Sequence, residues 1–163
     1  MKHIEYLRKA NEVAKRARAC GNTPFGAILV DAGGEVIMEQ GNAEGELHDA
    51  TAHAERMLAS RASAAFDKQK LWGCTLYTTF EPCPMCTGAI YWANIGRIVY
   101  GTSEKKLLEL TGADDKNPTF SMGADKVIAA GQKDIELLGP FEEVEEEIVA
   151  VHRDFWDPDT ANK

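Results

Sequence analysis

The chain has no long run of apolar residues and few cysteines, and each shortage excludes a class of protein. The longest purely apolar runs span only a few residues, so the sequence predicts no membrane-spanning helix. Residues 1–20 are rich in Lys and Arg without a continuous apolar core, which is not the pattern of a signal peptide. Four cysteines among 163 residues do not make a disulfide framework, which favours a reducing, cytoplasmic compartment.

Basic residues are fewer than acidic ones, and the formal net charge is −8. A protein that grips a long nucleic acid needs a basic surface to replace the counterions of the phosphates. Lys and Arg gather in residues 2–18, where we interpret them as the solvated face of a helix. The charge balance therefore favours a small, free substrate over a nucleic acid, and nothing predicts a membrane partner.

The remaining composition is that of an ordinary globular protein, 44% hydrophobic and 27% charged, without internal repeats or low-complexity tracts. A chain of 163 residues can bury one substantial core. We predict a single domain over residues 1–163, with residues 157–163 as a flexible tail.

The most informative residues are His53 and Glu55, followed further along by Cys83 and Cys86 inside Pro-Cys-Pro-Met-Cys. One imidazole and two thiolates supply three of the four positions around a tetrahedral zinc ion. Three protein ligands leave one position open for water, which is typical of a catalytic site. We predict one zinc ion per chain, held by His53, Cys83 and Cys86.

The parts of this pattern are weaker than their combination. A lone His-x-Glu is common at the start of a surface helix, and a lone Cys-x-x-Cys can be half of a structural zinc site, a redox pair or two core cysteines. A structural zinc site would need a fourth ligand, but Cys20 and Cys74 stand singly. We interpret these cysteines, together with His3, His48 and His152, as structural or surface residues.

Apolar periodicity and the positions of Gly and Pro predict helices that alternate with strands. Thr51 is predicted to cap the second helix. The expected architecture is a three-layer α/β/α domain with a five-stranded mixed sheet. The predicted helices cover residues 3–19, 53–66, 82–93, 104–110, 124–130 and 141–155, the predicted strands 25–30, 35–40, 76–79, 97–100 and 135–138, and the predicted loops 41–51 and 111–123.

Glu55 is a poor zinc ligand beside thiolates but a good proton carrier next to a metal-activated water. Two predicted helix N-termini carry the ligands, and their unpaired N–H groups favour thiolates. They converge where ligands bind in open α/β sheets, outside the carboxyl ends of strands. The pattern favours a hydrolysis in which Glu55 acts first as base and then as acid.

With these residues placed, the chain resembles the cytidine deaminase superfamily of zinc enzymes, and most closely its bacterial guanine deaminases. The resemblance rests on Pro-Phe-Gly-Ala at 24–27, Thr-Ala-His-Ala-Glu at 51–55 and Glu-Pro-Cys-Pro-Met-Cys at 81–86, which continues into Gly-Ala-Ile-Tyr-Trp-Ala at 88–93. The tRNA adenosine deaminases usually have Val in place of Phe25 and Pro84. Cytidine deaminases proper have a cysteine where His53 stands.

The resemblance implies residues that bind an aminated base. Asn42 would bond the purine ring, or it is a turn residue. Asp114 would read the purine edge, although Asp115 could take that role, or both could be solvated loop residues. Trp92 would wall the pocket or pack in the core. The implied substrate-binding set is Phe25, Asn42, Ala54, Trp92, Asp114 and Trp156, the last as an aromatic that closes the site.

The expected activity is the zinc-dependent conversion of a free aminated purine, guanine to xanthine plus ammonia. Cytosine, another small aminated heterocycle or a nucleoside are alternative substrates. A tRNA adenosine deaminase is disfavoured by charge, and a non-catalytic zinc subunit would be expected to lack Glu55. The resemblance, with an apolar seam on the last helix and the patch at residues 90–92, implies a homodimer, in which the C-terminal segments can be exchanged.

Overall fold

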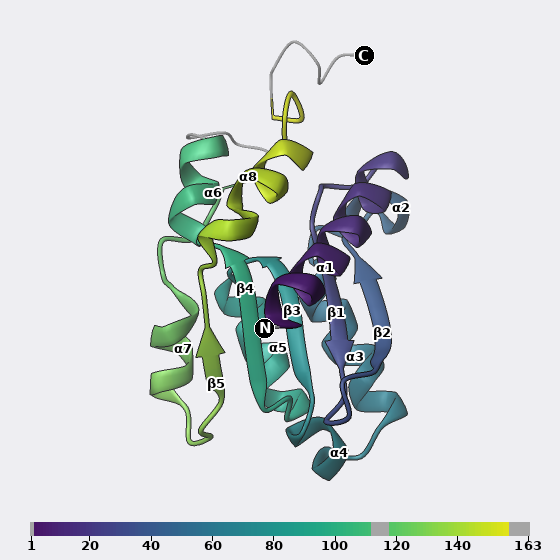
Figure 1. Cartoon of the computed structure of the whole chain (residues 1–163), viewed down its shortest axis with the longest axis vertical. Coiled ribbons are helices and arrows are strands. Elements are labelled where there is room, and N and C mark those ends of the chain that lie inside the picture. Colours follow the sequence, from purple (N-terminus) through teal and green to yellow (C-terminus); the bar gives the residue numbers. More distant parts are fainter. Residues whose placement is uncertain (1, 112–117, 157–163) are drawn as a thin grey trace.

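A computed structural model of the chain describes residues 2–111 and 118–156, in which five strands form one mixed sheet (Figure 1). The strand order is β2-β1-β3-β4-β5. β1 runs antiparallel to β2 and β3, with Ile28 opposite Tyr77, while β4 is parallel to β3 and β5. The strands are β1 (Gly26–Val30), β2 (Val36–Gly41), β3 (Thr75–Phe80), β4 (Arg97–Thr102) and β5 (Glu136–Leu138).

Helices cover both faces of the sheet, which confirms the three-layer prediction. α1 and α8 pack on one face, and α3 and α5 pack on the other (Figure 1). Within the described ranges, no helix is both long and apolar enough to cross a bilayer. The helices are α1 (Lys2–Ala19), α2 (Glu44–Leu47), α3 (Ala54–Ala65), α4 (Lys68–Trp72), α5 (Pro84–Ala93), α6 (Glu104–Thr111), α7 (Ala124–Ala130) and α8 (Glu142–Val151).

The central strands β1 and β3 are buried on both faces. All residues of β1 and β3 are buried. Leu29 and Leu76 join the core under α3 and α5, whereas Ile28 and Tyr77 join the core under α1 and α8. A strand covered on both faces can be continuously hydrophobic in place of alternating, which explains the apolar run of β1.

Several local predictions are wrong. The loop expected over residues 41–51 contains α2, and α4 was not predicted. His53, not Thr51, occupies the N-cap of α3, and the Thr51 hydroxyl donates to Asp49. Pro82 precedes the cap of α5, so only Pro84 lies in its first turn. The last helix, predicted over residues 141–155, spans Glu142–Val151 and is followed by a turn.

Glu81 ties together the segments that follow β3 and β4. Its Oε1 accepts the Glu104 N–H at 3.1 Å, and its Oε2 accepts the Ala124 N–H at 2.9 Å. The Glu81 N–H donates to the Thr102 carbonyl at 2.8 Å. One side chain from the cysteine motif thus fixes the starts of α6 and α7 against the end of the sheet.

Gly26 allows α1 to approach β1 closely. A Cβ at this position would lie 2.4 Å from both the Ala10 carbonyl oxygen and the Ala14 nitrogen. We expect Gly26→Ala to lower the free energy of unfolding by roughly 1–3 kcal/mol, because the backbone of α1 has to shift. Chemical denaturation at a fixed zinc concentration measures the change.

Gly88→Ala is the matched control. A Cβ at Gly88, inside α5, would meet no described atom within 4 Å. This substitution should raise the free energy of unfolding by about 0.5–1 kcal/mol, because alanine lowers the conformational entropy of the unfolded chain. If Gly26→Ala is as stable as Gly88→Ala, the close contact between α1 and β1 is not present in solution.

Candidate active site

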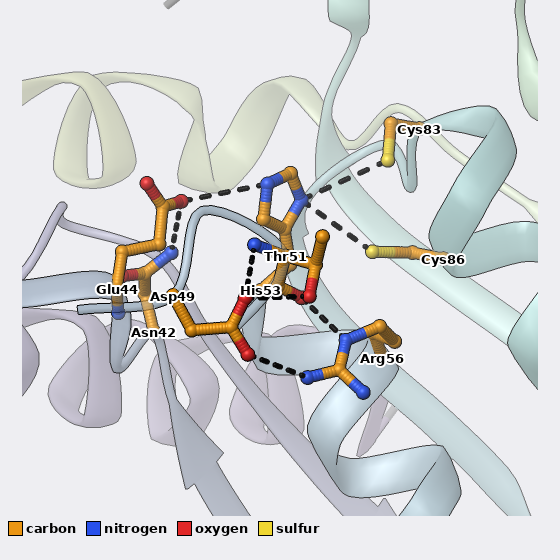
Figure 2. Close-up of polar contacts among 8 residues, drawn as sticks. All are labelled: Asn42, Glu44, Asp49, Thr51, His53, Arg56, Cys83 and Cys86. Carbon is orange, nitrogen blue, oxygen red and sulfur yellow. Dashed lines mark hydrogen bonds and ion pairs between the residues drawn. The ribbon is translucent and has the colours of Figure 1, made fainter. Parts of the chain in front are cut away.

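The structure brings His53, Cys83 and Cys86 together, as the sequence predicts. The His53 Nδ1 atom lies 3.7 Å from the Cys83 sulfur and 3.6 Å from the Cys86 sulfur (Figure 2). In a tetrahedral zinc site, bond lengths near 2.1 Å to nitrogen and 2.3 Å to sulfur place these atoms roughly 3.6 Å apart. The geometry and the donor types therefore fit zinc.

The local structure explains this convergence. His53 is the N-cap of α3, Cys83 is the N-cap of α5, and Cys86 lies in the first turn of α5. Contacts with Cys86 and His53 lower the pKa of Cys83 to about 4. The hydrogen bond with Cys83 and burial raise the pKa of Cys86. Two sulfurs this close ionise together only beside a cation, so this pair suits a divalent metal.

Glu44 contacts the metal-ligand histidine from the other side. Its Oε1 lies 3.4 Å from the His53 Nε2 atom, while Nδ1 faces the sulfurs (Figure 2). The same oxygen accepts a hydrogen bond from the Asn42 side-chain amide at 2.8 Å. A carboxylate on the second ring nitrogen orients a ligand histidine and raises its basicity. We therefore interpret Glu44 as a positioning residue for His53.

Glu55 is buried in the first turn of α3, next to the ligand cluster. The Thr78 hydroxyl, on β3, donates to its Oε1 at 2.9 Å. Burial raises the pKa of Glu55, opposed by the nearby His53. A carboxyl group held in this way, beside a metal site, is placed to take up and release protons.

A cavity of about 340 Å³ opens onto these groups. Three of the predicted substrate residues, Phe25, Asn42 and Ala54, lie in its wall together with His53 and Glu55. The side-chain oxygen of Asn42 accepts the Glu44 N–H, as a turn residue does, and its contact with a purine ring stays a prediction. Asp114 and Asp115 lie outside the described residues, as does the predicted tail at 157–163.

Both interpretations of Trp92 are wrong. Its side chain is 76% exposed, and it belongs neither to the cavity wall nor to the core. Cys86, Ile90 and Ala93 form the buried face of α5, at the spacing of three and four residues that defines one side of a helix. Residue 92 follows residue 90 by about 200° around the helix axis and therefore points outward.

Trp156 supports the cavity wall and is not part of its lining. The indole N–H donates to the His152 Nδ1 atom at 3.0 Å, and its ring lies 6.4 Å from that of Phe25. Burial lowers the pKa of His152 to about 4, so the imidazole is neutral and can accept this bond. The prediction that Trp156 closes the site is not met in this structure, because it packs behind Phe25.

Sequence reasoning missed four residues at the site. Glu44 and Glu104 line the cavity, as does Glu81, and Thr78 binds Glu55. Glu81 follows the end of β3, Glu104 follows β4, and Glu44 follows β2. The rule that ligands bind beyond strand ends could have identified the first two, since β3 and β4 are parallel neighbours.

Residues 1–102 match the family model of the cytidine and deoxycytidylate deaminase zinc-binding region. The chain belongs to this family. It is thus a zinc hydrolase of the cytidine deaminase-like class, in agreement with the ligand cluster and the fold.

Three similar proteins that are named as deaminases differ in substrate. A Schizosaccharomyces pombe protein named probable cytosine deaminase is 39% identical over 158 residues, which is 96% of this chain and 93% of that protein. A guanine deaminase structure from Bacillus subtilis is 38% identical, with a TM-score of 0.62 over 71% of this chain and 73% of its own. A tRNA:A34 deaminase structure is 30% identical, with a TM-score of 0.69, over 91% of this chain and 99% of that one.

The role of Glu44 predicts a change in metal affinity. Glu44→Gln should weaken zinc binding by about 10–100-fold, because the amide replaces the carboxylate partner of His53. Competition with a chromophoric chelator measures the affinity. Glu39→Gln removes the same charge from an exposed side chain on β2 and should leave zinc affinity unchanged. Equal affinities of the two variants would show that Glu44 does not position the ligand.

Proposed function

We propose that the chain deaminates a free aminated nucleobase by hydrolysis, with guanine as the first candidate. One observation carries this proposal: the metal-ligand cluster and the buried Glu55 face the same cavity of about 340 Å³, and Phe25 and Phe80 give that cavity apolar walls. Polar groups at a few positions in an otherwise apolar cavity are typical of a site for a flat heterocycle.

The residues of the chain divide the reaction between them. Bound zinc would be held by His53, Cys83 and Cys86 and would activate a water molecule by lowering its pKa. Glu55 takes a proton from this water and delivers protons to a ring nitrogen and to the departing amine. A C–O bond forms at the ring carbon that carries the exocyclic amine. The exocyclic C–N bond then breaks, and ammonia leaves. Thr78 keeps the carboxyl group of Glu55 in place through these transfers.

The charge of the cavity supports a free base over a nucleic acid. The carboxylates of Glu44 and Glu81 line it, and the formal net charge of the chain is −8. Phosphate groups near such a lining would be repelled, whereas a neutral base would not.

Two bases deserve a direct comparison. Guanine is favoured by the motif blocks at residues 24–27 and 81–93 and by the likeness to the B. subtilis guanine deaminase structure. Cytosine is the second candidate, because the relative named probable cytosine deaminase aligns over 96% of this chain. The homodimer and the cytoplasmic location remain proposals beside this activity.

Glu55→Gln tests the proposed proton transfer. We expect a loss of at least about 10²–10⁴-fold in kcat, because the amide cannot carry the proton. Zinc content and the unfolding midpoint should stay as in the unsubstituted protein, since Glu55 is not a proposed ligand. Glu39→Gln again serves as the charge-matched control. Near-normal turnover by Glu55→Gln would assign the proton transfer to another residue.

A panel of substrates tests the choice of base. Guanine should exceed cytosine and adenine by at least about a hundredfold in kcat/KM, because a base without guanine's N–H edge would leave Asp114, the carboxylate that the resemblance assigns to the purine edge, partly unpaired. Ammonia release over free bases, nucleosides and a tRNA anticodon stem-loop measures this. Faster turnover of cytosine would favour the second candidate, and faster turnover of a nucleoside or the RNA would refute the free-base proposal.

A further inference from the structure

Glu104 is a carboxyl group of the cavity to which the reaction assigns no role. It is the first residue of α6, directly beyond the end of β4, and it is only 7% exposed. It lines the same cavity as His53 and Glu55. Its backbone N–H is held by Glu81 at 3.1 Å, so the main chain from which the side chain extends is fixed.

One carboxyl oxygen of Glu104 lacks a hydrogen-bond partner, unlike the carboxyl groups of its neighbours Glu55 and Glu81. Its Oε2 is buried and accepts no hydrogen bond from any described residue. By contrast, Glu55 accepts from Thr78, and Glu81 accepts from two backbone N–H groups. A buried polar atom without a partner destabilises a fold, so its presence inside a cavity points to a ligand that supplies the missing bond.

The protonation state of Glu104 limits which ligands can pair with it. Burial is the main cause that raises the pKa of Glu104. Burial therefore favours the neutral, protonated form of this carboxyl group. A protonated carboxyl group presents one O–H donor beside one carbonyl acceptor.

We propose that Glu104 is a specificity-determining residue that pairs with the lactam edge of a free base, its carbonyl accepting the ring N–H and its hydroxyl donating to the neighbouring ring carbonyl. This proposal rests on the proposed deamination of a free base. Guanine and cytosine both carry such an edge, whereas the six-membered ring of adenine has neither the N–H nor the carbonyl. Glu104 thus selects lactam bases over adenine.

Binding measurements separate this role from a structural one. Zinc-loaded Glu55→Gln protein is the parent, because it should not consume the base during a calorimetric titration. Adding Glu104→Leu should weaken the binding of guanine or cytosine by roughly 10–100-fold, since it removes a paired donor and acceptor. Adding Glu104→Gln should cost much less, because an amide presents the same two groups in one plane.

The ligand itself can also be altered. 1-Methylguanine and 1-methylcytosine lack the ring N–H, so the parent should bind them at least about tenfold more weakly than guanine and cytosine. The Glu104→Leu variant should bind each methylated base and its unmethylated counterpart alike. Equal binding of the bases by the parent and the Leu variant would overturn the proposal, as would an equal loss in the Gln and Leu variants.

Stability supplies a second readout. Glu104→Leu should raise the midpoint of thermal unfolding at unchanged zinc content, because it removes an unpaired buried oxygen; a lowered midpoint would overturn the proposal in favour of a structural role. Glu109→Leu, at an exposed position of α6, is the control and should change neither base binding nor zinc content.

These results distinguish the two proposals. If Glu104→Leu binds bases normally while the unsubstituted protein deaminates them, the role of Glu104 alone is refuted. If the unsubstituted protein deaminates no base but the binding pattern is as expected, the proposed function alone is refuted. If the parent binds no base and the unsubstituted protein deaminates none, both are refuted.

Discussion

The close approach of one imidazole and two sulfurs is the constraint on which the rest of the structure depends. The His53 nitrogen lies 3.7 and 3.6 Å from the sulfurs, so α3 and α5 have to begin at almost the same point. Both helices reach it because they pack side by side on one face of the sheet. The sulfurs ionise together only beside a cation, so folding and metal binding support one another.

Features that depend on short stretches of chain could be predicted from sequence. The metal ligands follow from spacing within two local motifs, and the sheet follows from the buried runs of β1 and β3. The start of a helix is harder to place: the pattern predicts Thr51 as the cap of α3, but Thr51 donates to Asp49 and the helix begins after His53. Trp92 was misplaced because α5 is apolar on several sides, which leaves its buried face undefined until it packs.

Contacts between distant segments could not be predicted from local patterns. Thr78 meets Glu55 across 23 positions of the chain, and Glu104 enters the cavity only because β4 ends beside β3. Glu44 contacts His53 from the start of α2, where the sequence pattern predicts only a loop. Residues that hold or orient the reacting groups are therefore harder to identify than the ligands themselves, because their role exists only in the folded chain.

Glu81 connects the part of the chain that matches the family model to the part that follows it. Its carboxylate fastens the starts of α6 and α7 to the end of the sheet, and residues 1–102, which match the family, end where β4 ends. The ligands and Glu55 lie before this boundary, whereas Glu104 and Phe120 in the cavity wall lie beyond it. Evolution could thus exchange the segment that contacts one side of the base and leave the catalytic half untouched. In this way one zinc-dependent reaction could be adapted to different aminated substrates.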